Sequence, residues 1–191
     1  REYTEQIKRI NNQLHSLRLL PVPSKDTIKS LEKIIVQLEK EIKQLEQKLQ
    51  LLLEQWQPDQ LKSVSSVKGI GKRAAAMLIV FTQGFKHTHN HRQLISFAGL
   101  APTQYSSGSS IQGKPRIYKR GGKNLRDVLY MCSMNAMKTN TACKALYERL
   151  RANGKTGKQA LIAVCNKLLK QVFAVVKNNS LYQPNYCSAK P

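Results

Sequence analysis

Apolar residues recur every three or four positions through the first quarter of the chain. One run of this spacing precedes Pro21-Val22-Pro23, and a longer one follows it with Glu and Lys between its apolar positions. The two runs are Ile7, Ile10, Leu14 and Leu17, then Ile28, Leu31, Ile35, Leu38, Ile42, Leu45, Leu49 and Leu52. This spacing is typical of coiled coils. The pattern therefore predicts a long antiparallel coiled-coil hairpin of two helices over residues 1–57.

The second of these helices is the longer one, so part of its apolar seam has no partner within the hairpin. We expect that remaining seam to pair with a second copy of the chain, which would give a dimer or a tetramer. Ser24 or Asp26 is suited to cap the second helix by accepting a backbone N–H bond.

Beyond Gln57-Pro58 the pattern predicts a compact helical domain over residues 58–180 and a flexible tail over residues 181–191. We expect helices over residues 124–138, 142–150 and 158–177, the last capped by Thr156. The apolar face of the last helix is broad enough to be core. The fold class is thus mainly α. Because the helical pattern starts at Arg1, we expect the chain to be a fragment of a longer protein.

Charge is distributed very unevenly along the chain. Residues 1–56 hold 10 basic and 8 acidic side chains, whereas residues 57–191 hold 22 basic ones against Asp59, Asp127 and Glu148. A net charge of +19 on the second region, out of +21 in total, is the electrostatic pattern of a polyanion-binding protein. We find no signal peptide or membrane-spanning run in the sequence, so we expect nucleic acid and no membrane as the partner.

The same counts exclude one chemistry from the basic region. Two-metal nucleases hold Mg²⁺ with several converging carboxylates, and three scattered acids do not supply them. Strand cleavage would then use a side-chain nucleophile, or a metal site on another domain or chain. We assign no metal ligands here.

A segment rich in Ser and Gly, followed by fixed cations, carries the candidate chemistry. Ser or Tyr hydroxyls can attack phosphorus, and Arg or Lys can stabilise the transition-state charge. The nucleophile candidates include Ser106 and Ser107, while Tyr105 and Tyr118 are suited to stack on a base. The candidate phosphate ligands are Arg116, Lys119, Arg120, Lys123 and Arg126. The alternative is a surface loop whose cations make only nonspecific backbone contacts.

Gly69-Ile70-Gly71, before an Ala-rich helical pattern, resembles the turn of helix-hairpin-helix DNA-binding modules. Glycines permit a tight backbone, and a helix start offers free N–H groups to phosphate. Lys68, Lys72 and Arg73 add charge. The alternative is an ordinary glycine-containing connection between packed helices.

Two further groups are interpreted as non-catalytic. The histidines of His87-Thr88-His89-Asn90-His91 lack neighbouring carboxylate or thiol ligands, so we interpret them as a solvated loop with Asn90 capping the next helix. The four cysteines form no C-x-x-C pair, and we expect reduced, partly buried thiols.

Several motifs occur in a characteristic order. They are Gly69-Ile70-Gly71, Phe97-Ala98-Gly99-Leu100-Ala101-Pro102, Tyr105-Ser106-Ser107-Gly108, Lys119-Arg120-Gly121-Gly122 and a helix beginning Asn124-Leu125-Arg126. This succession, over roughly residues 60–180, resembles the C-terminal half of the bridge-RNA-guided insertion-sequence transposases. That family has an N-terminal RuvC-like DEDD domain, which is absent from this sequence.

The resemblance implies a DNA recombinase in which a serine forms a covalent protein–DNA intermediate. The family's serine falls on Ser107, with Ser106 as a competitor. It also implies a guide RNA, Mg²⁺ in the RuvC-like domain, and a bacterial cytoplasmic, nucleoid-associated protein. We expect this fragment alone to bind nucleic acid without cutting DNA. A non-catalytic DNA-binding and oligomerisation module, or an RNA-binding scaffold, remains the alternative.

Overall fold

The computed structural model describes residues 2–103, 106–107, 111–112, 116–117 and 121–184. The prediction of a mainly α fold is confirmed. The chain divides into two compact units, Arg1–Leu52 and Leu53–Pro191. We call the first the helical hairpin and the second the compact unit, and describe each by itself.

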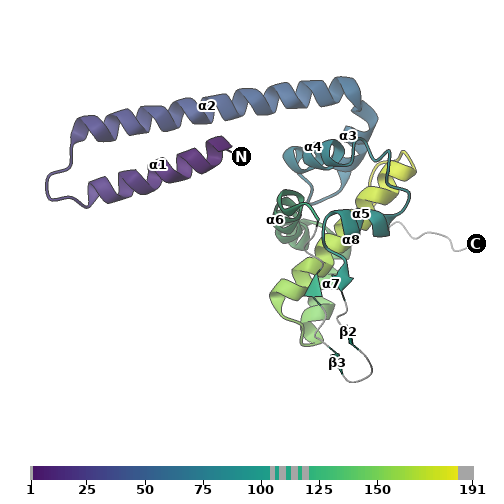
Figure 1. The fold of residues 1–191 in the computed structure, drawn as a ribbon. Helices are drawn as coiled ribbons and strands as arrows, with labels where there is room; N and C mark the ends of the chain where they lie inside the picture. The colour runs from purple at the N-terminus through teal and green to yellow at the C-terminus, as the bar shows by residue number, and fades with distance from the viewer. Residues whose placement is uncertain (1, 104–105, 108–110, 113–115, 118–120, 185–191) are drawn as a thin grey trace, which may run out of the picture. The chain divides into compact units, whose positions relative to one another are not determined.

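The helical hairpin consists of α1 (Glu2–Arg18) and most of α2 (Lys25–Trp56), which run antiparallel (Figure 1). Arg18 Nη2 and Glu32 Oε1 form an ion pair at 2.7 Å. Ser24 Oγ accepts a bond from the Thr27 N–H at 3.4 Å, so Ser24 rather than Asp26 caps α2.

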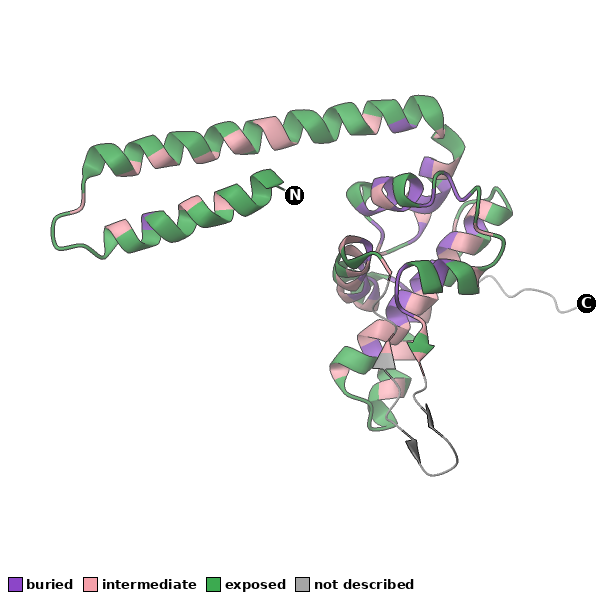
Figure 2. Cartoon of the chain, viewed as in Figure 1, coloured by how far each residue is buried: buried purple, intermediate pink, exposed green. Residues whose placement is uncertain are grey.

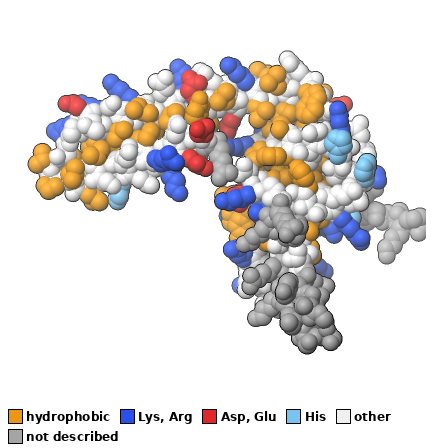
Figure 3. Space-filling model, in the orientation of Figure 1, with side chains coloured by type: hydrophobic (Ala, Val, Ile, Leu, Met, Phe, Trp, Pro, Cys, Tyr) orange, Lys and Arg blue, Asp and Glu red, His pale blue; other side chains and the backbone are white. Residues whose placement is uncertain are grey.

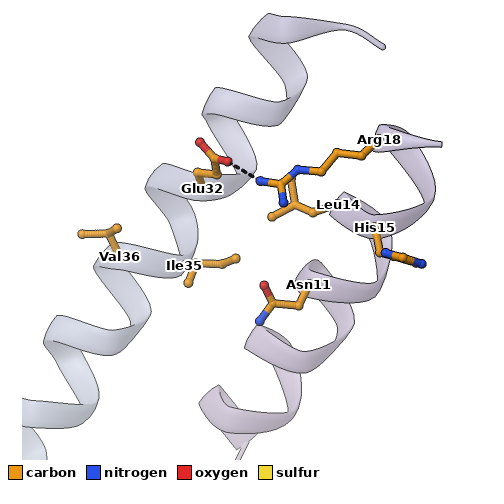
Figure 4. Close-up of a pocket in the computed structure, with 7 residues that line it drawn as sticks. All are labelled: Asn11, Leu14, His15, Arg18, Glu32, Ile35 and Val36. Atoms are coloured by element: carbon orange, nitrogen blue, oxygen red, sulfur yellow. Dashed lines mark hydrogen bonds and ion pairs between the residues drawn. The ribbon is translucent and has the colours of Figure 1, made fainter. Parts of the chain in front are cut away.

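The two helices enclose a groove of about 410 Å³. Figure 4 shows Leu14 and Ile35 pointing toward the facing helix, whereas Val36 and His15 point away. Leu14 is buried and Val36 is exposed, as an amphipathic pair requires. Farther along α2 the seam leaves its partner, and Leu45, Leu49 and Leu52 are 51%, 40% and 62% exposed.

Helices and four very short strands build the compact unit. They are α3 (Pro58–Ser66), α4 (Lys72–Phe81), α5 (His91–Phe97), β1 (Pro102–Thr103), β2 (Ser106–Ser107), β3 (Ile111–Gln112), β4 (Arg116–Ile117), α6 (Lys123–Thr139), α7 (Thr141–Ala152) and α8 (Gly157–Lys177). The buried residues of the chain concentrate here (Figure 2).

Helix α8 is the centre of the compact unit, because α3, α5, α6 and α7 all pack against it. Thr156 begins it with a capping box that Gln159 completes, which confirms the predicted cap. Its length and apolar composition would also suit a membrane span. Six of its apolar side chains are fully buried among the other helices, however, as expected of a core helix: Ala160, Val164, Cys165, Leu168, Leu169 and Val172.

Tyr182, within the segment predicted to be a flexible tail, makes two hydrogen bonds to the compact unit. Its N–H donates to Ser66 Oγ at 2.8 Å, and its hydroxyl donates to Asn140 Oδ1 at 3.1 Å. These bonds tie the segment after α8 to α3 and to the start of α7, because the end of α8 lies beside both. Residues 185–191 of the predicted tail lie outside the described residues.

Candidate nucleic-acid interface

Ser106 and Ser107 lie on a short antiparallel ladder. Their strand β2 pairs with β3, with Ser106 opposite Gln112 and Ser107 opposite Ile111. An outer ladder pairs β1 with β4, with Thr103 opposite Arg116. We call the segment 102–117 the β-arm. Its two ladders place both candidate nucleophiles on paired backbone.

Other candidates of this segment are not described. Tyr105, Tyr118, Lys119 and Arg120 lie outside the described residues, and Arg116 is placed through its backbone in β4. Their predicted roles in binding phosphate or bases stay predictions.

The base of the β-arm is rigid because helix α5 ends directly beneath it. Gly99 takes a left-handed conformation (φ 68°), and the N–H groups of Gly99 and Leu100 bond back to Ser96 and Ile95 at 2.8 and 3.0 Å. This is a Schellman helix ending, in which glycine is favoured at the left-handed position. Ala98 and Leu100 are fully buried. The Phe97–Pro102 motif therefore anchors the β-arm to the core.

Gly121 closes the other end of the β-arm against the same helix ending. A Cβ built on Gly121 would lie 2.3 Å from both the Gly99 nitrogen and the Phe97 carbonyl oxygen, so only glycine fits. The Gly122 N–H also donates to the Phe97 carbonyl at 3.3 Å. Both ends of the β-arm are thus held to the end of α5 by direct backbone contact.

Lys123 and Arg126 lie in the first turn of α6, next to this base. One guanidinium nitrogen of Arg126 donates to the Ala98 carbonyl at 3.4 Å, whereas Lys123 is exposed. No side chain of the described residues caps the start of α6. Arg126 therefore supports the helix ending of α5, while the exposed Lys123 is accessible to an anion.

The two glycines of the Gly69-Ile70-Gly71 turn differ in their surroundings. Gly69 has φ 103°, and a Cβ there would lie 2.5 Å from the Cβ of Ala136 on α6. Its backbone therefore packs directly on that helix. Gly71 begins α4 with open space around it, and among the described residues no side chain caps this helix start. Lys68, Lys72 and Arg73 are all exposed around the turn.

Helix α6 separates the base of the β-arm from the Gly69-Ile70-Gly71 turn. The base of the β-arm adjoins its first turn, and Gly69 packs on Ala136 near its other end. Thirteen residues of helix correspond to about 20 Å. Lys123 at the start of α6 is therefore separated along this helix from the Gly69 turn by about the length of six base pairs of DNA.

Asn140 positions the turn, and the sequence analysis missed it. Its Nδ2 donates to the Lys68 carbonyl at 3.1 Å and to Gln171 Oε1 at 3.0 Å, while its Oδ1 accepts from the Cys143 N–H at 3.3 Å. The side chain is only 1% exposed. A polar residue directly before the α7 pattern was the available signal, since Asn is a favoured helix cap.

The histidine segment lies at the surface, and Asn90 caps α5 as predicted, with the Gln93 N–H donating to its side chain at 2.8 Å. His87 and His89 are exposed, and His91 lies edge-on to Phe173, with ring centroids 6.4 Å apart. The described part of the chain contains no group of three or more His, Cys, Asp or Glu side chains suited to a metal ion.

Cys132, Cys143 and Cys165 are free and buried, as expected. Burial raises the pKa of the Cys143 and Cys165 thiols to about 11. Burial also raises the pKa of Cys132, although a hydrogen bond from the Gly71 backbone opposes the effect. These thiols are therefore packing groups, since a nucleophilic cysteine needs a lowered pKa. Cys187 lies outside the described residues.

Positive charge surrounds the candidate interface. Residues 60–126 contain 12 Lys and Arg residues and no Asp or Glu. On the visible face of the compact unit, Lys and Arg outnumber acidic side chains (Figure 3). The exposed cations of the described residues can bind phosphates.

Comparison with known proteins supports this interpretation. Residues 61–148 match the model of the Transposase IS116/IS110/IS902 family. The chain is 32% identical over 120 residues to an uncharacterized 43.6 kDa protein of insertion element IS110 from Streptomyces coelicolor, covering 63% of this chain and 29% of that protein. It is 33% identical over 117 residues to the pilin gene-inverting protein of Moraxella lacunata, covering 61% and 36%.

A third relative is the transposase for insertion sequence element IS1111A of Coxiella burnetii. It is 27% identical over 130 residues, which cover 65% of this chain and 35% of that protein. The chain spans about a third of the length of the curated relatives that it matches.

Proposed function

We propose that this chain is the C-terminal part of a DNA transposase or site-specific recombinase, since residues 61–148 match the model of the Transposase IS116/IS110/IS902 family. The observation that carries the proposal is the anchored β-arm, which bears Ser106 and Ser107 within a stretch of 67 residues free of acidic side chains. The resemblance to a pilin gene-inverting protein and to a transposase supports DNA as the substrate.

In the proposed reaction, Ser107 Oγ attacks a DNA phosphorus atom. The new Oγ–P bond forms as the P–O bond to one deoxyribose breaks, the serine proton passes to a base, and the leaving deoxyribose oxygen takes up a proton. The cations around the β-arm offset the charge on the nonbridging oxygens. A second strand hydroxyl can later displace serine, so the phosphodiester energy is conserved.

The resemblance to the family also implies Mg²⁺, which needs a group of ligands. The described residues bring together no ligand group for it, and residues 92–126 contain neither His nor an acid that would activate Ser107. We therefore propose that the activating groups belong to a RuvC-like domain outside this chain, contributed in a composite site. This chain alone would bind DNA without cutting it.

Target choice and assembly complete the proposal. We propose that a guide RNA selects the DNA sequence in the bacterial cytoplasm, and that the unpartnered seam of α2 pairs copies of the protein. Leu45, Leu49 and Leu52 on that seam support the pairing, because exposed leucines at heptad spacing are the contact surface of coiled coils.

The missing base near Ser107 also favours a second candidate, a non-catalytic module that binds DNA and oligomerises. In that case the cations of the β-arm would only grip the DNA backbone, and another domain would cut by hydrolysis. The two candidates differ in one observable, the covalent protein–DNA bond.

The test uses the full-length enzyme with its guide RNA, Mg²⁺ and a DNA substrate. We expect a covalent adduct on a denaturing gel, mapped by peptide analysis to Ser107. Ser107→Ala should abolish the adduct and keep DNA binding, and Ser106→Ala is the matched control that should retain it. DNA cleavage without any adduct in the unsubstituted enzyme would contradict the serine mechanism and support the second candidate.

A further inference from the structure

Two exposed phenylalanines flank a small cavity next to the base of the β-arm. Phe81 ends α4 and Phe97 ends α5, and they are 41% and 48% exposed. The cavity has a volume of about 300 Å³. Its lining is completed by Thr82, Gln83, His87, Thr88 and Gln93. Covering these exposed aromatic rings with a binding partner would be favourable, because it removes apolar surface from water.

The wall between the two rings is built by an unusual turn. Gln83, Gly84 and Phe85 follow one another with φ values of 50°, 67° and 60°. This is the left-handed backbone conformation, which residues other than glycine adopt at a cost in free energy. Such strain persists where the surrounding structure enforces it, and it concentrates at functional sites.

The surroundings of this turn do enforce it. The Phe85 N–H donates to Thr82 Oγ1 at 3.2 Å, and Gln60 Nε2 donates to the Gly84 carbonyl at 3.0 Å. Phe85 is itself buried in the core. The cavity is therefore preformed by rigid elements, as ligand pockets usually are.

The rim of the cavity offers groups that can both donate and accept hydrogen bonds. Gln93 Oε1 accepts from the His89 N–H at 2.8 Å, and within the described residues its Nε2 has no partner. The His87 ring and the Gln83 amide are exposed beside it. A cavity lined by two phenylalanines together with amide and imidazole groups suits a nucleobase, whose faces stack and whose edge carries donors and acceptors.

Charge and position indicate the source of the base. Every lining residue belongs to the acid-free stretch 60–126, and Lys86 and Arg92 are exposed within the same segment. The Phe97 carbonyl contacts Gly122 directly below the β-arm. We propose that the cavity between Phe81 and Phe97 binds an unstacked nucleobase of the DNA strand that the β-arm handles. This inference rests on the proposed function and names a binding site within it.

The test measures binding of the 191-residue chain to a DNA single strand and to a strand of equal length that lacks its bases. Both carry the same phosphate charge, so their affinity ratio reports base contacts alone. We expect the unsubstituted chain to prefer the strand with bases by about tenfold, which is the scale of one aromatic–base stack. Duplex DNA and an RNA strand of the same sequence are measured in parallel.

Variants separate stacking from packing. Phe97→Leu and Phe81→Leu keep an apolar side chain but remove the ring, and each should abolish most of the preference. Phe97→Trp should retain it, and the exposed Met131, replaced by Ala, is the matched control outside the cavity. The slope of log affinity against log salt should stay unchanged, because no phosphate contact is removed. Unfolding midpoints of all variants check that the fold is intact.

A preference that survives in both Leu variants would overturn the inference, as would a preference seen with RNA alone. If the chain binds duplex DNA but shows no preference for the strand with bases, the inferred nucleobase site is contradicted while the proposed function is not. Failure of the unsubstituted chain to bind any nucleic acid would overturn both.

Discussion

Gly69 and Gly71 lie two residues apart in one turn, yet the structure gives them different tasks. Gly69 combines a positive φ with direct contact to Ala136, whereas Gly71 has an ordinary φ of −81° and open space. How much a glycine contributes to stability therefore depends on which atoms an added Cβ would contact, and the sequence alone does not give those contacts. The same holds for Gly121, which adjoins Gly99 and Phe97 at the base of the β-arm.

We expect Gly69→Ala to lower the free energy of unfolding by about 3 kcal/mol, from the left-handed backbone and the overpacked contact together. Gly71→Ala is the matched control and should change it by less than about 0.5 kcal/mol. Urea unfolding followed by circular dichroism measures both. Equal effects of the two substitutions would show that the contact with Ala136 does not define this turn.

Asn140 links α7, α8, the Gly-Ile-Gly turn and the segment of Tyr182 through one buried amide. We expect Asn140→Ala to lower the free energy of unfolding by about 2 to 3 kcal/mol, because it removes a helix cap and leaves buried partners unpaired. Thermal unfolding would detect the change. Asn135→Ala, at an exposed position of α6, serves as the control and should be nearly neutral.

At the scale of elements, the ends of two helices form the features from which we infer function. Helices α4 and α5 both end in a left-handed residue, Gln83 and Gly99, and each ending shapes a functional feature. The first forms a wall of the aromatic cavity, and the second is the base of the β-arm. The compact unit thus places its candidate chemistry where helices stop, because backbone and side chains are accessible there.

The three helices α6, α7 and α8 each bury a neutral thiol. Burial of these thiols makes the stability of the folded chain depend on pH. Burial raises the pKa of Cys143 and Cys165 from near 9 to about 11 in the folded state, whereas unfolded thiols ionise from about pH 8.5. The folded state therefore holds these protons more tightly. Their contribution to stability is complete below pH 8.5 and falls as pH rises toward 11.

We expect the unfolding midpoint of the chain to fall with pH across this window, and to fall less steeply in Cys165→Ala. The comparison of slopes cancels the titration of other groups shared by both proteins. At pH 8, Cys143 and Cys165 should also resist alkylation in the folded state and react after unfolding, as read by peptide mass spectrometry. Rapid alkylation of the folded protein would contradict their burial.

At the scale of the whole molecule, an almost neutral helical hairpin precedes a strongly basic compact unit. The hairpin buries few side chains, and the far seam of α2 stays exposed. The compact unit has a continuous core and the candidate interface. This division suits assembly through the hairpin and nucleic-acid binding through the compact unit.

We expect light scattering to give a mass of at least twice the 21.6 kDa of one chain, rising with concentration. Replacing Leu45 and Leu49 together by Lys should return the mass to that of one chain, since charges at seam positions oppose pairing. Gln44 and Gln47 replaced by Lys on the exposed face are the matched control. A concentration-independent mass of one chain in the unsubstituted protein would contradict pairing through α2.

Local patterns in the sequence predicted the elements well. The helix expected over residues 124–138 is Lys123–Thr139, and the one expected over 158–177 is Gly157–Lys177. The caps at Asn90 and Thr156 are confirmed. These features depend on residues within four positions of each other, so periodicity and capping chemistry are sufficient. The uneven charge likewise follows from counting and indicates a polyanion partner.

The tertiary structure alone decided what the distant residues do. Tyr182 bonds to Ser66 across 116 positions, and the backbone of Gly69 contacts Ala136 near the end of α6. Phe81 and Phe97, 16 positions apart, line one cavity only because the fold brings the ends of α4 and α5 to it. The sequence by itself determined where helices begin, where they end and what charge they carry. Contacts between distant positions depend on how the core packs, and no local period encodes them.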